Sequence, residues 1–341
     1  MIVAMSKNIF KPDPMLDNAL RPKRWEDFVG QEKAKTNLRI MLEAAKKREE
    51  VVDHLLFYGG AGLGKTTLAY LIAQEIHANL KITSGPAIEK AADLASLLAN
   101  LEEGDILFID EIHRLNKMIE EVLYSAMESR MLNLVLGKRS STRTVQLDLP
   151  PFTLIGATTR MGLLSSPLRS RFGAIFKLDF YELEDIKKIL KNNAKVLGIK
   201  ISDEATEILA KASRATPRVA NRLLKRSRDL ATIEGKDEID AAISRKILEL
   251  FDIDEWGLEA TDRKILEVII DRFNGGPVGI KALAAATNEE EDTIEEIYEP
   301  YLMRLGLLER TTRGRMVSDA GYKHLNLYHL GKKGEQKRLI E

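Results

Sequence analysis

Apolar residues follow two different patterns along the first half of the chain. Candidate strands lie at 55–58, 80–84, 105–109, 153–157 and 174–179; the most apolar of them, such as Leu55–Tyr58, read as buried parallel strands. The stretches between them repeat apolar residues at helical spacing, as from Leu115 to Met127. Strands that alternate with helices predict an α/β domain with a parallel, doubly wound sheet over residues 18–182.

The rest of the chain has other patterns. Residues 183–255 show helical spacing without a strand signal, which predicts a second, all-α domain. Three further helical stretches and a short hairpin at 307–317 predict a winged-helix domain over residues 256–330. We expect a flexible N-terminal arm at 1–17, where periodicity is weak, and a disordered tail at 331–341.

One additional hairpin interrupts the first domain. Residues 131–148 alternate apolar and polar positions on both sides of a polar tip at 137–143, as a hairpin should. Leu132, Leu134 and Leu136 share one face. These leucines are either core or an exposed apolar strip; the charged tip gives no reason for entry into the core and favours a partner surface.

A glycine-rich string, Gly59-Gly60-Ala61-Gly62-Leu63-Gly64-Lys65-Thr66, follows the first predicted strand and precedes a helical stretch. Such a loop at a strand-to-helix turn binds phosphate. Its N–H groups can surround a β-phosphate, while Lys65 bridges phosphate oxygens and Thr66 offers its hydroxyl to Mg²⁺. An accidental loop is the alternative, but the strand, the helix and a later acidic strand end favour a nucleoside-triphosphate site.

The acidic strand end is Asp110-Glu111, which follows four apolar residues, 106–109, at the end of a predicted strand. Ligands of doubly wound sheets bind at this edge. We expect Asp110 to hold Mg²⁺ through water and Glu111 to orient and deprotonate the attacking water. Two surface carboxylates would not explain why four apolar residues place them at this edge.

Hydroxyl groups follow the next predicted strand. Thr158 or Thr159 could bond the γ-phosphate or the attacking water, although threonine is also a common residue at strand ends. The single imidazole of His113 is more often structural than a ligand.

Two arginines have unusual positions. Thr216-Pro217-Arg218 reads as the N-cap, first and second residues of a helix, where a cation opposes the helix dipole unless an anion such as a nucleotide phosphate is near. Residues 166–173 read as a short capped helix stopped by glycine. Arg169 and Arg171 then point to different faces, so one can project outward. Surface salt bridges are the alternative for both.

Bulk composition limits the remaining possibilities. The chain has 341 residues, enough for two or three domains, and it contains no cysteine, which excludes disulfides and thiolate metal sites. No run of 18 apolar residues exists, so no membrane partner is expected, and Met1–Met5 is too short for a signal-peptide core. A cytoplasmic protein is expected.

The net charge is zero, but charge is locally uneven. Residues 289–299 are acidic, whereas Arg310, Arg313 and Arg315 follow closely. This contrast is either a solvated helix face beside a basic hairpin or part of a functional surface.

From Leu20 to His324 the sequence resembles the RuvB family of AAA+ motors for Holliday-junction branch migration. Five strings carry the resemblance: Leu20–Pro22 with Asp27–Gln31, Gly62–Ala69, Phe108–Leu115, Leu147–Arg160 and Ser166–Gly173. It implies an AAA+ core, a helical lid and a winged helix, with ATP and Mg²⁺ as cofactors. It also implies a homohexameric ring on duplex DNA and Holliday junctions in DNA repair, RuvA bound by the hairpin 131–148, and RuvC in the resolution complex.

The resemblance also implies roles for individual residues. Lys65 and Thr66 match the Walker A pair, Asp110 and Glu111 the Walker B pair, Thr159 sensor 1, Arg171 the arginine finger and Arg218 sensor 2. The phosphate contacts would further include Gly62, Gly64 and Thr67, and Leu20, Arg21 and Tyr181 would line the adenine pocket. Arg310, Arg313 and Arg315 would contact DNA phosphates without reading bases, as expected for a tip of three arginines.

Two departures from the family are visible. Gly60-Ala61 stands where the family usually has two prolines, so the loop loses rigidity and nucleotide affinity is expected to fall. Met127–Met131 departs from the family's usual acidic string, which removes support for nucleotide contacts from that stretch.

Three other functions fit parts of the sequence. An AAA+ initiator or clamp-loader-like switch would use ATP for assembly on DNA, and the hairpin and finger strings argue against it. A DNA-binding module with a degenerate ATPase is opposed by the complete set of candidate catalytic residues. A metabolic P-loop kinase fits least, because the last third offers no small-substrate site.

Overall fold

The computed structural model describes residues 14–136 and 143–325. Its contacts divide the chain into two units. Residues 21–180 form one, called here the α/β unit, and residues 1–20 with 181–341 form the other, called the helical unit.

A five-stranded parallel sheet forms the centre of the α/β unit, with strand order β2-β3-β6-β1-β7. The strands are β1 (Leu55–Tyr58), β2 (Leu80–Ser84), β3 (Ile106–Asp110), β6 (Thr153–Thr158) and β7 (Ala174–Lys177). The expected parallel sheet is confirmed. The strand bounds differ by one or two residues: β3 runs one residue later than expected, β6 ends one residue later, and β7 ends two residues earlier. β1, β3 and β6 are buried along almost their whole length, which explains their uninterrupted apolar sequences.

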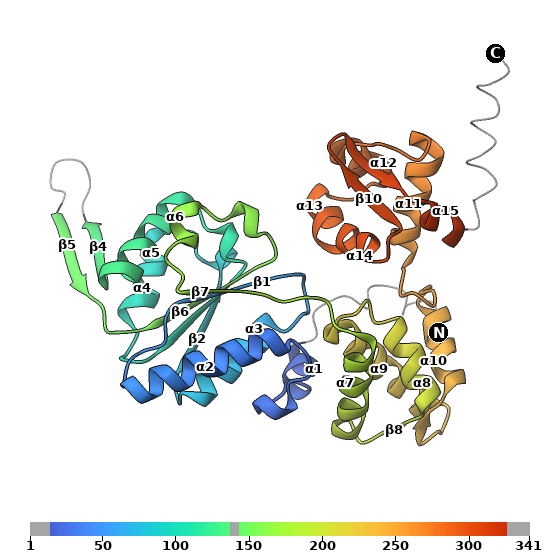
Figure 1. The fold of residues 1–341 in the computed structure, drawn as a ribbon, viewed down its shortest axis with the longest axis horizontal. Helices are drawn as coiled ribbons and strands as arrows, with labels where there is room; N and C mark the ends of the chain where they lie inside the picture. Colours follow the sequence, from blue (N-terminus) through green and yellow to red (C-terminus); the bar gives the residue numbers. More distant parts are fainter. Residues whose placement is uncertain (1–13, 137–142, 326–341) are drawn as a thin grey trace, which may run out of the picture. The chain divides into compact units, whose positions relative to one another are not determined.

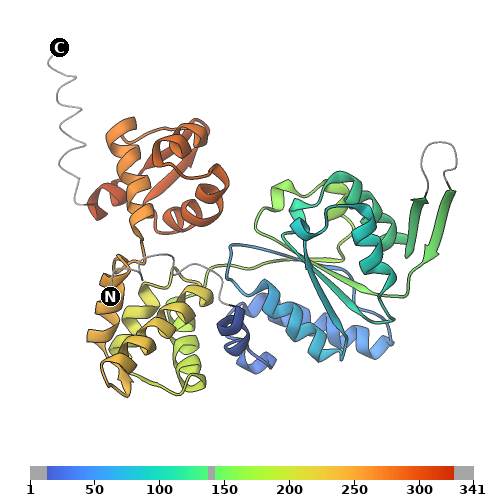
Figure 2. The same cartoon turned by 180° about the vertical axis from the view of Figure 1, so that it is seen from behind.

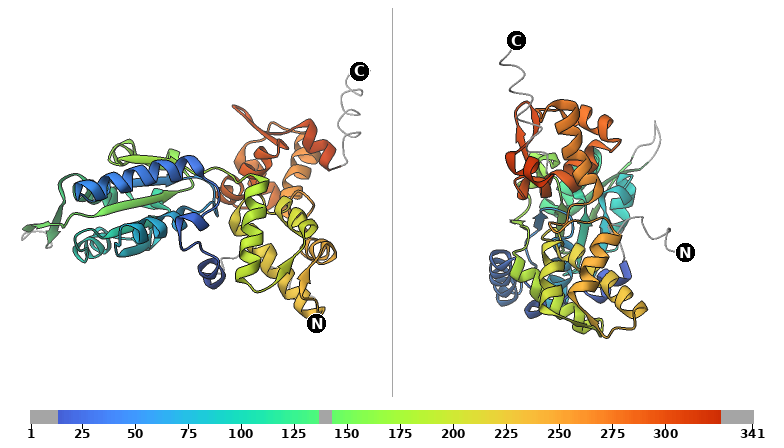
Figure 3. Two further views of the ribbon diagram at one scale, coloured as in Figure 1. Left: turned by 60° about the horizontal axis from the view of Figure 1, so that its bottom comes forward. Right: turned by 90° about the vertical axis from the view of Figure 1, so that its right-hand side faces the viewer.

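Helices cover both faces of this sheet (Figures 1 and 3). α2 (Glu32–Arg48) and α3 (Lys65–Glu75) lie on one face, and α4 (Ala91–Ala99) and α5 (Lys117–Ser129) lie on the other. Leu94, Leu98 and Leu123 of the second pair share a buried core with Leu107 and Leu154 of the sheet. The shorter helices of this unit are η1 (Trp25–Asp27), η2 (Gly85–Ala87), η3 (Ile112–Arg114), η4 (Met161–Leu163) and α6 (Ser166–Arg169).

The predicted hairpin is present as β4 (Met131–Leu136) and β5 (Arg143–Asp148), and it projects beyond α5 (Figures 1 and 2). Leu132 is fully buried in the core, so the expectation that it belongs to an exposed strip is wrong. Leu132 is buried because β4 packs beside α5 at this position. Leu147, its antiparallel partner, is 40% exposed. The side chains of Leu134 and Leu136 are outside the described side chains.

The first part of the helical unit is a helical domain. Its helices are α7 (Leu183–Val196), α8 (Asp203–Lys211), α9 (Pro217–Ile233) and α10 (Ala241–Leu250). The expectation of no strands is wrong in detail, because β8 (Lys200–Ile201) pairs with β9 (Glu238–Ile239). Two residues are too few to give a periodic signal.

The N-terminal arm is also more ordered than expected at its end. α1 (Pro14–Ala19) packs against α9, so residues 14–17 are not a loose arm. Residues 1–13 and the tail 331–341 lie outside the described residues.

The second part of the helical unit is a winged helix, as predicted. Its helices are α11 (Ala260–Phe273), α12 (Ile280–Thr287), α13 (Glu291–Thr293), the π-helical turn η5 (Ile294–Tyr298), α14 (Glu299–Arg304) and α15 (Asp319–His324). The wing is β10 (Leu308–Thr311) and β11 (Gly314–Val317). Ile265, Ile269, Leu283, Leu302 and Leu307 are fully buried in its core.

None of the helices in the described parts of the chain combines the length and apolar composition that a membrane crossing requires.

Candidate nucleotide and DNA sites

The phosphate loop runs from Gly59 to Thr66 between β1 and α3. A side chain at Gly59 would place its Cβ only 2.3 Å from the carbonyl oxygen of Leu178. Gly62 and Gly64 have φ angles of 78° and 102°, in the left-handed region that glycine tolerates best. The close approach and the reversed backbone therefore require glycine in this loop.

Lys65 is the first residue of α3, and only 8% of its surface is exposed. Its Nζ donates to the carbonyl oxygens of Gly59 at 2.7 Å and Gly60 at 2.8 Å. The ammonium group therefore lies inside the loop. Thr66 and Thr67 occupy the first turn of α3, where unpaired N–H groups attract an anion.

The candidate acidic pair lies at the same edge of the sheet. Asp110 is the last residue of β3, and its Oδ1 accepts the backbone N–H of Glu111 at 2.9 Å. Glu111 has a φ of 49°, and its carboxylate accepts from Arg114 at 3.2 Å. Arg114 was missed from sequence, although its spacing of three residues from Glu111 was a usable signal.

Thr158 and Thr159, at the end of β6, could not be distinguished by sequence, but the structure gives them different environments. Thr158 is fully buried; its Oγ1 accepts the N–H of Arg160 and shares a 2.9 Å hydrogen bond with Nδ1 of His113. His113 thus links η3 to β6, a structural role. Thr159 follows the strand and is partly exposed, so it is the better candidate for contact with a ligand.

Arg171 lies at the opposite edge of the sheet. The N–H of Gly173, two residues later, donates to the carbonyl oxygen of His54, which precedes β1. The phosphate loop follows the other end of β1, whose four residues span about 13 Å. Arg171 is therefore remote from the phosphate loop of its own chain.

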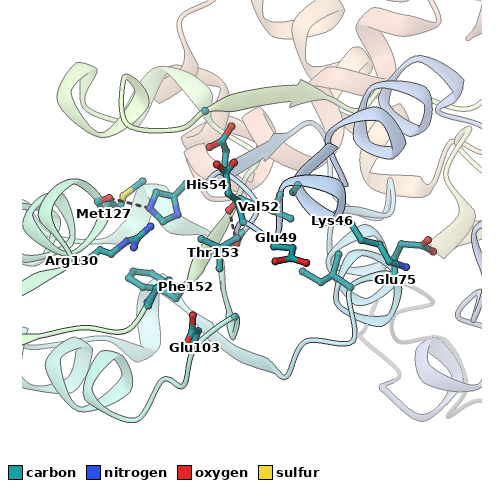
Figure 4. Close-up of a pocket in the computed structure, with 18 of the residues that line it drawn as sticks. Lys46, Glu49, Val52, His54, Glu75, Glu103, Met127, Arg130, Phe152 and Thr153 are labelled. Atoms are coloured by element: carbon teal, nitrogen blue, oxygen red, sulfur yellow. Dashed lines mark hydrogen bonds between the residues drawn. The ribbon is translucent and has the colours of Figure 1, made fainter. Parts of the chain in front are cut away.

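A cavity of about 800 Å³ opens at this opposite edge (Figure 4). Arg171 is one of its lining residues. His54 lies in its wall, where burial lowers the pKa of the imidazole. Its Nδ1 accepts the N–H of Leu154 at 2.9 Å, and its Nε2 donates to the carbonyl oxygen of Met127 at 3.2 Å. The neutral ring thus connects β6 to α5 through two hydrogen bonds.

The guanidinium of Arg171 is held in place. It donates to Glu128 and to the carbonyl oxygen of Pro167, both at 2.8 Å, and lies 4.7 Å from the ring centre of Tyr124. Glu128 was missed from sequence, because 43 residues separate it from Arg171 and no local spacing signals the pair.

Most of the remaining candidates for nucleotide contact belong to the helical unit. Thr216 caps α9 by accepting the N–H of Val219, and Arg218 lies partly exposed in the first turn, as predicted. Tyr181 and Leu20 are buried in this unit. Arg21 belongs to the α/β unit, where its guanidinium stacks 3.9 Å above the ring of Tyr70.

The three wing arginines are not equivalent. Arg313 is exposed between β10 and β11 and makes no salt bridge to any described residue. The side chain of Arg310 is 55% exposed and lies 3.5 Å from Glu295. Arg315 is 5% exposed and donates to Glu299 at 2.9 Å and to Glu295 at 2.7 Å.

The expectation that Arg315 contacts phosphate is therefore wrong for this structure, because two carboxylates already occupy its guanidinium. The acidic stretch that precedes the wing is likewise not simply a solvated face. Glu299 is 2% exposed and forms a buried pair with the wing.

A phosphate loop at a strand-to-helix turn, an acidic strand end, a helical lid and a winged helix together define an AAA+ P-loop ATPase with a DNA-binding domain. Comparison with known families gives three consecutive matches. They are described as the Holliday junction DNA helicase RuvB P-loop domain at residues 20–178, the RuvB AAA lid domain at 181–254 and the RuvB C-terminal winged helix domain at 255–326. The chain belongs to the RuvB family.

Individual relatives agree with this assignment. The Holliday junction branch migration complex subunit RuvB of Clostridium kluyveri is 54% identical over 314 residues, 92% of this chain and 90% of the relative. That of Kosmotoga olearia is 52% identical over 315 residues, 92% of each chain. The solved Thermotoga maritima RuvB branch migration motor is 52% identical, with a TM-score of 0.84, covering 90% of this chain and 98% of that one.

Proposed function

We propose that this chain is the ATP-hydrolysing motor subunit that drives branch migration of Holliday junctions in recombination and DNA repair. One observation carries the proposal: the phosphate loop and the acidic strand end share one sheet edge in a chain that also contains a lid and a winged helix with an exposed arginine tip. The RuvB family assignment supplies the particular substrate.

The α/β unit supplies the phosphate site. Lys65 and Thr66, with the backbone of Gly62 and Gly64 and the first-turn Thr67, bind the phosphates of ATP. Leu20, Arg21 and Tyr181 are proposed to contact the adenine.

The donor set fits Mg²⁺, because the Thr66 hydroxyl and the Asp110 carboxylate are the hard oxygen ligands that this ion prefers, and Asp110 keeps one carboxylate oxygen beyond its bond to Glu111. When bound, Mg²⁺ would neutralise negative charge on the phosphate oxygens.

Glu111 is the proposed base that orients and deprotonates water, and Thr159 is the proposed sensor of the γ-phosphate. Glu111→Gln should keep ATP binding and lose steady-state hydrolysis, because the amide still fits but accepts no proton. Lys65→Ala should instead weaken binding. Equilibrium ATP binding and phosphate release, measured on the same preparations, separate the two effects; normal turnover by Glu111→Gln would remove it from this role.

Arg171 and Arg218 complete the proposed catalytic set. Arg171 lies a strand length from its own phosphate loop, so a neighbouring subunit's nucleotide is its proposed target, in a homohexameric ring. Arg218, at the start of α9, is the proposed sensor in the lid.

Arg313 and Arg310 are the proposed contacts to duplex phosphates. RuvA is the proposed partner of the hairpin 131–148, and RuvC would join the same assembly at resolution. We propose domain limits at 18–182, 183–255 and 256–330, and a cytoplasmic location.

The deciding experiment follows a synthetic four-way junction. With ATP and RuvA the chain should convert the junction into two duplexes, and the Glu111→Gln variant should not. An initiator or clamp-loader-like switch would instead show ATP-dependent DNA binding without any junction movement, and that result would reject the motor.

A further inference from the structure

Arg214 joins the lid to the winged helix through a buried charge pair. It lies two residues before Thr216, the N-cap of α9. Its guanidinium donates to Asp262 at 2.5 Å and to the carbonyl oxygen of Ile297 at 3.0 Å, and it lies 4.7 Å from the ring centre of Tyr301. All three partners belong to the winged helix.

The pair is almost completely buried. The side chain of Arg214 is 6% exposed and that of Asp262 is 0% exposed. Asp262 also accepts the backbone N–H of Glu259, which fixes its carboxylate at the start of α11. A buried ion pair between two domains is seldom the most stable filling, since apolar residues of similar volume often serve as well or better. The ion pair instead fixes the relative orientation of the two domains, because the planar guanidinium of Arg214 can bond all its partners in only one orientation.

The backbone around Arg214 is also specialised. Arg214 and Ala215 have φ angles of 55° and 52°, which are unfavourable for residues other than glycine. Nearby, a Cβ at Gly257 would stand 2.6 Å from the carbonyl oxygen of Ala212, so the linker passes tightly against the lid. Tyr301 then donates to the carbonyl oxygen of Trp256 at 2.5 Å.

The same short segment contacts the nucleotide-sensing candidates. The carbonyl oxygen of Ala215 accepts the N–H of Tyr181 at 2.9 Å, and the carbonyl oxygen of Tyr181 accepts from Arg304 of the winged helix at 3.2 Å. Arg218 follows Arg214 by four residues, in the first turn of α9. Residues 213–218 thus contain the proposed sensor, Arg218, and contact both the proposed adenine contact, Tyr181, and the winged helix.

We propose that Arg214 is the coupling residue that makes the lid and the winged helix move as one body. Arg214 is not one of the residues proposed to bind nucleotide or DNA. It transmits a rotation of the lid, set by the nucleotide at Arg218, to the DNA-contacting wing. The rigid connection stands on the geometry alone, and its link to nucleotide rests on the proposed function.

The absence of cysteine from the chain makes a direct test possible. Glu204→Cys on α8 and Lys281→Cys on α12 replace exposed residues of the lid and the winged helix and accept two spin labels at unique positions. Electron paramagnetic resonance should give one narrow distance distribution that is the same without nucleotide, with ADP and with a non-hydrolysable ATP analogue.

The same distance is then measured with Arg214→Met and Asp262→Leu together, which fill the junction with apolar volume and leave no unpaired charge. The distribution should broaden. Stimulation of ATP hydrolysis by duplex DNA should fall by about tenfold, a typical size for coupling between two sites, while DNA-free hydrolysis and duplex binding stay unchanged. Arg226→Met is the matched control, because it also replaces an arginine by methionine but removes a salt bridge to Asp229 that lies wholly within α9 of the lid.

A melting curve accompanies each variant. If the double variant does not fold, Arg214→Lys takes its place: it keeps the charge but cannot hold Asp262 and Ile297 together, so the distances should still broaden.

A wild-type distance that changes with nucleotide would overturn the single body. A folded double variant with a narrow distance distribution and full stimulation of ATP hydrolysis by DNA would show that Arg214 contributes only packing and does not couple the two domains. Because the distance is read without junction movement, failure of the motor assignment would leave this result interpretable.

Discussion

The wing arginines offer a quantitative contrast between a structural and a DNA-binding cation. Arg315→Ala removes one partner of the buried pair with Glu299, whose side chain is only 3% exposed. Breaking a buried pair leaves an uncompensated charge and costs about 3–5 kcal/mol. In a domain of this size, each kcal/mol corresponds to about 4–8 °C, so the unfolding transition of the winged helix should fall by about 12 °C or more.

Arg313→Ala should behave in the opposite way. Its side chain is exposed and pairs with no described carboxylate. The free energy of unfolding should therefore change by less than about 0.5 kcal/mol, as is typical of surface sites, and the melting temperature should hardly move. Duplex affinity should fall about equally for different sequences, and the slope of log affinity against log salt should become shallower by about 0.9, one phosphate contact.

Calorimetry and a salt titration of duplex binding, made on both variants, test the contrast. Arg315→Met with Glu299→Leu is the control, because an apolar replacement should recover most of the stability without changing the salt slope. The reasoning is refuted if Arg315→Ala melts like the wild type and loses the same salt slope as Arg313→Ala.

Three further predictions follow from the α/β unit and the domain junction. Arg171→Ala should lower hydrolysis by up to about 10³ while ATP binding remains; mixing it with Lys65→Ala subunits should restore part of the activity if the finger acts between neighbours, and no recovery under subunit exchange would argue against a shared site. Leu147→Asp on the hairpin should leave the melting temperature nearly unchanged and weaken RuvA capture, whereas Leu132→Asp should lower the melting temperature sharply because that leucine is fully buried; equal thermal losses would contradict this division. Burial, and then the neighbouring Asp262, raise the pKa of Glu259 to about 7, so the folded state loses stability as pH rises from about 4.5 through 7. Glu259→Gln should remove this loss, which discounted for partial exposure is on the order of 2 kcal/mol at pH 8, and a stability difference from the wild type that is constant between pH 5 and 8 would exclude Glu259 as its source.

Local sequence was sufficient for much of the α/β unit. Buried parallel strands need uninterrupted apolar runs, so β1, β3 and β6 were visible. The phosphate loop needs glycine where the backbone reverses or passes another chain segment closely. The capping of α9 by Thr216 was visible for the same reason, since capping depends on residues within one turn. Elements as short as β8 and β9 could not be found, because two residues carry no period.

Tertiary structure decided the roles of side chains whose partners are distant in sequence. Arg313 and Arg315 are two residues apart and look alike in sequence, yet one is exposed and the other is buried against Glu299. Leu132 joined the core through its packing beside α5, which its alternating pattern could not show.

The same limit applies to the links that lie beyond a single helix turn. Glu128 meets Arg171 across 43 residues and Arg214 meets Asp262 across 48. Sequence by itself determined the elements and the phosphate chemistry, because both depend on neighbouring residues. Only the packed chain decided which charges are paired, because an ion pair is set by distance in space, and no local pattern encodes it.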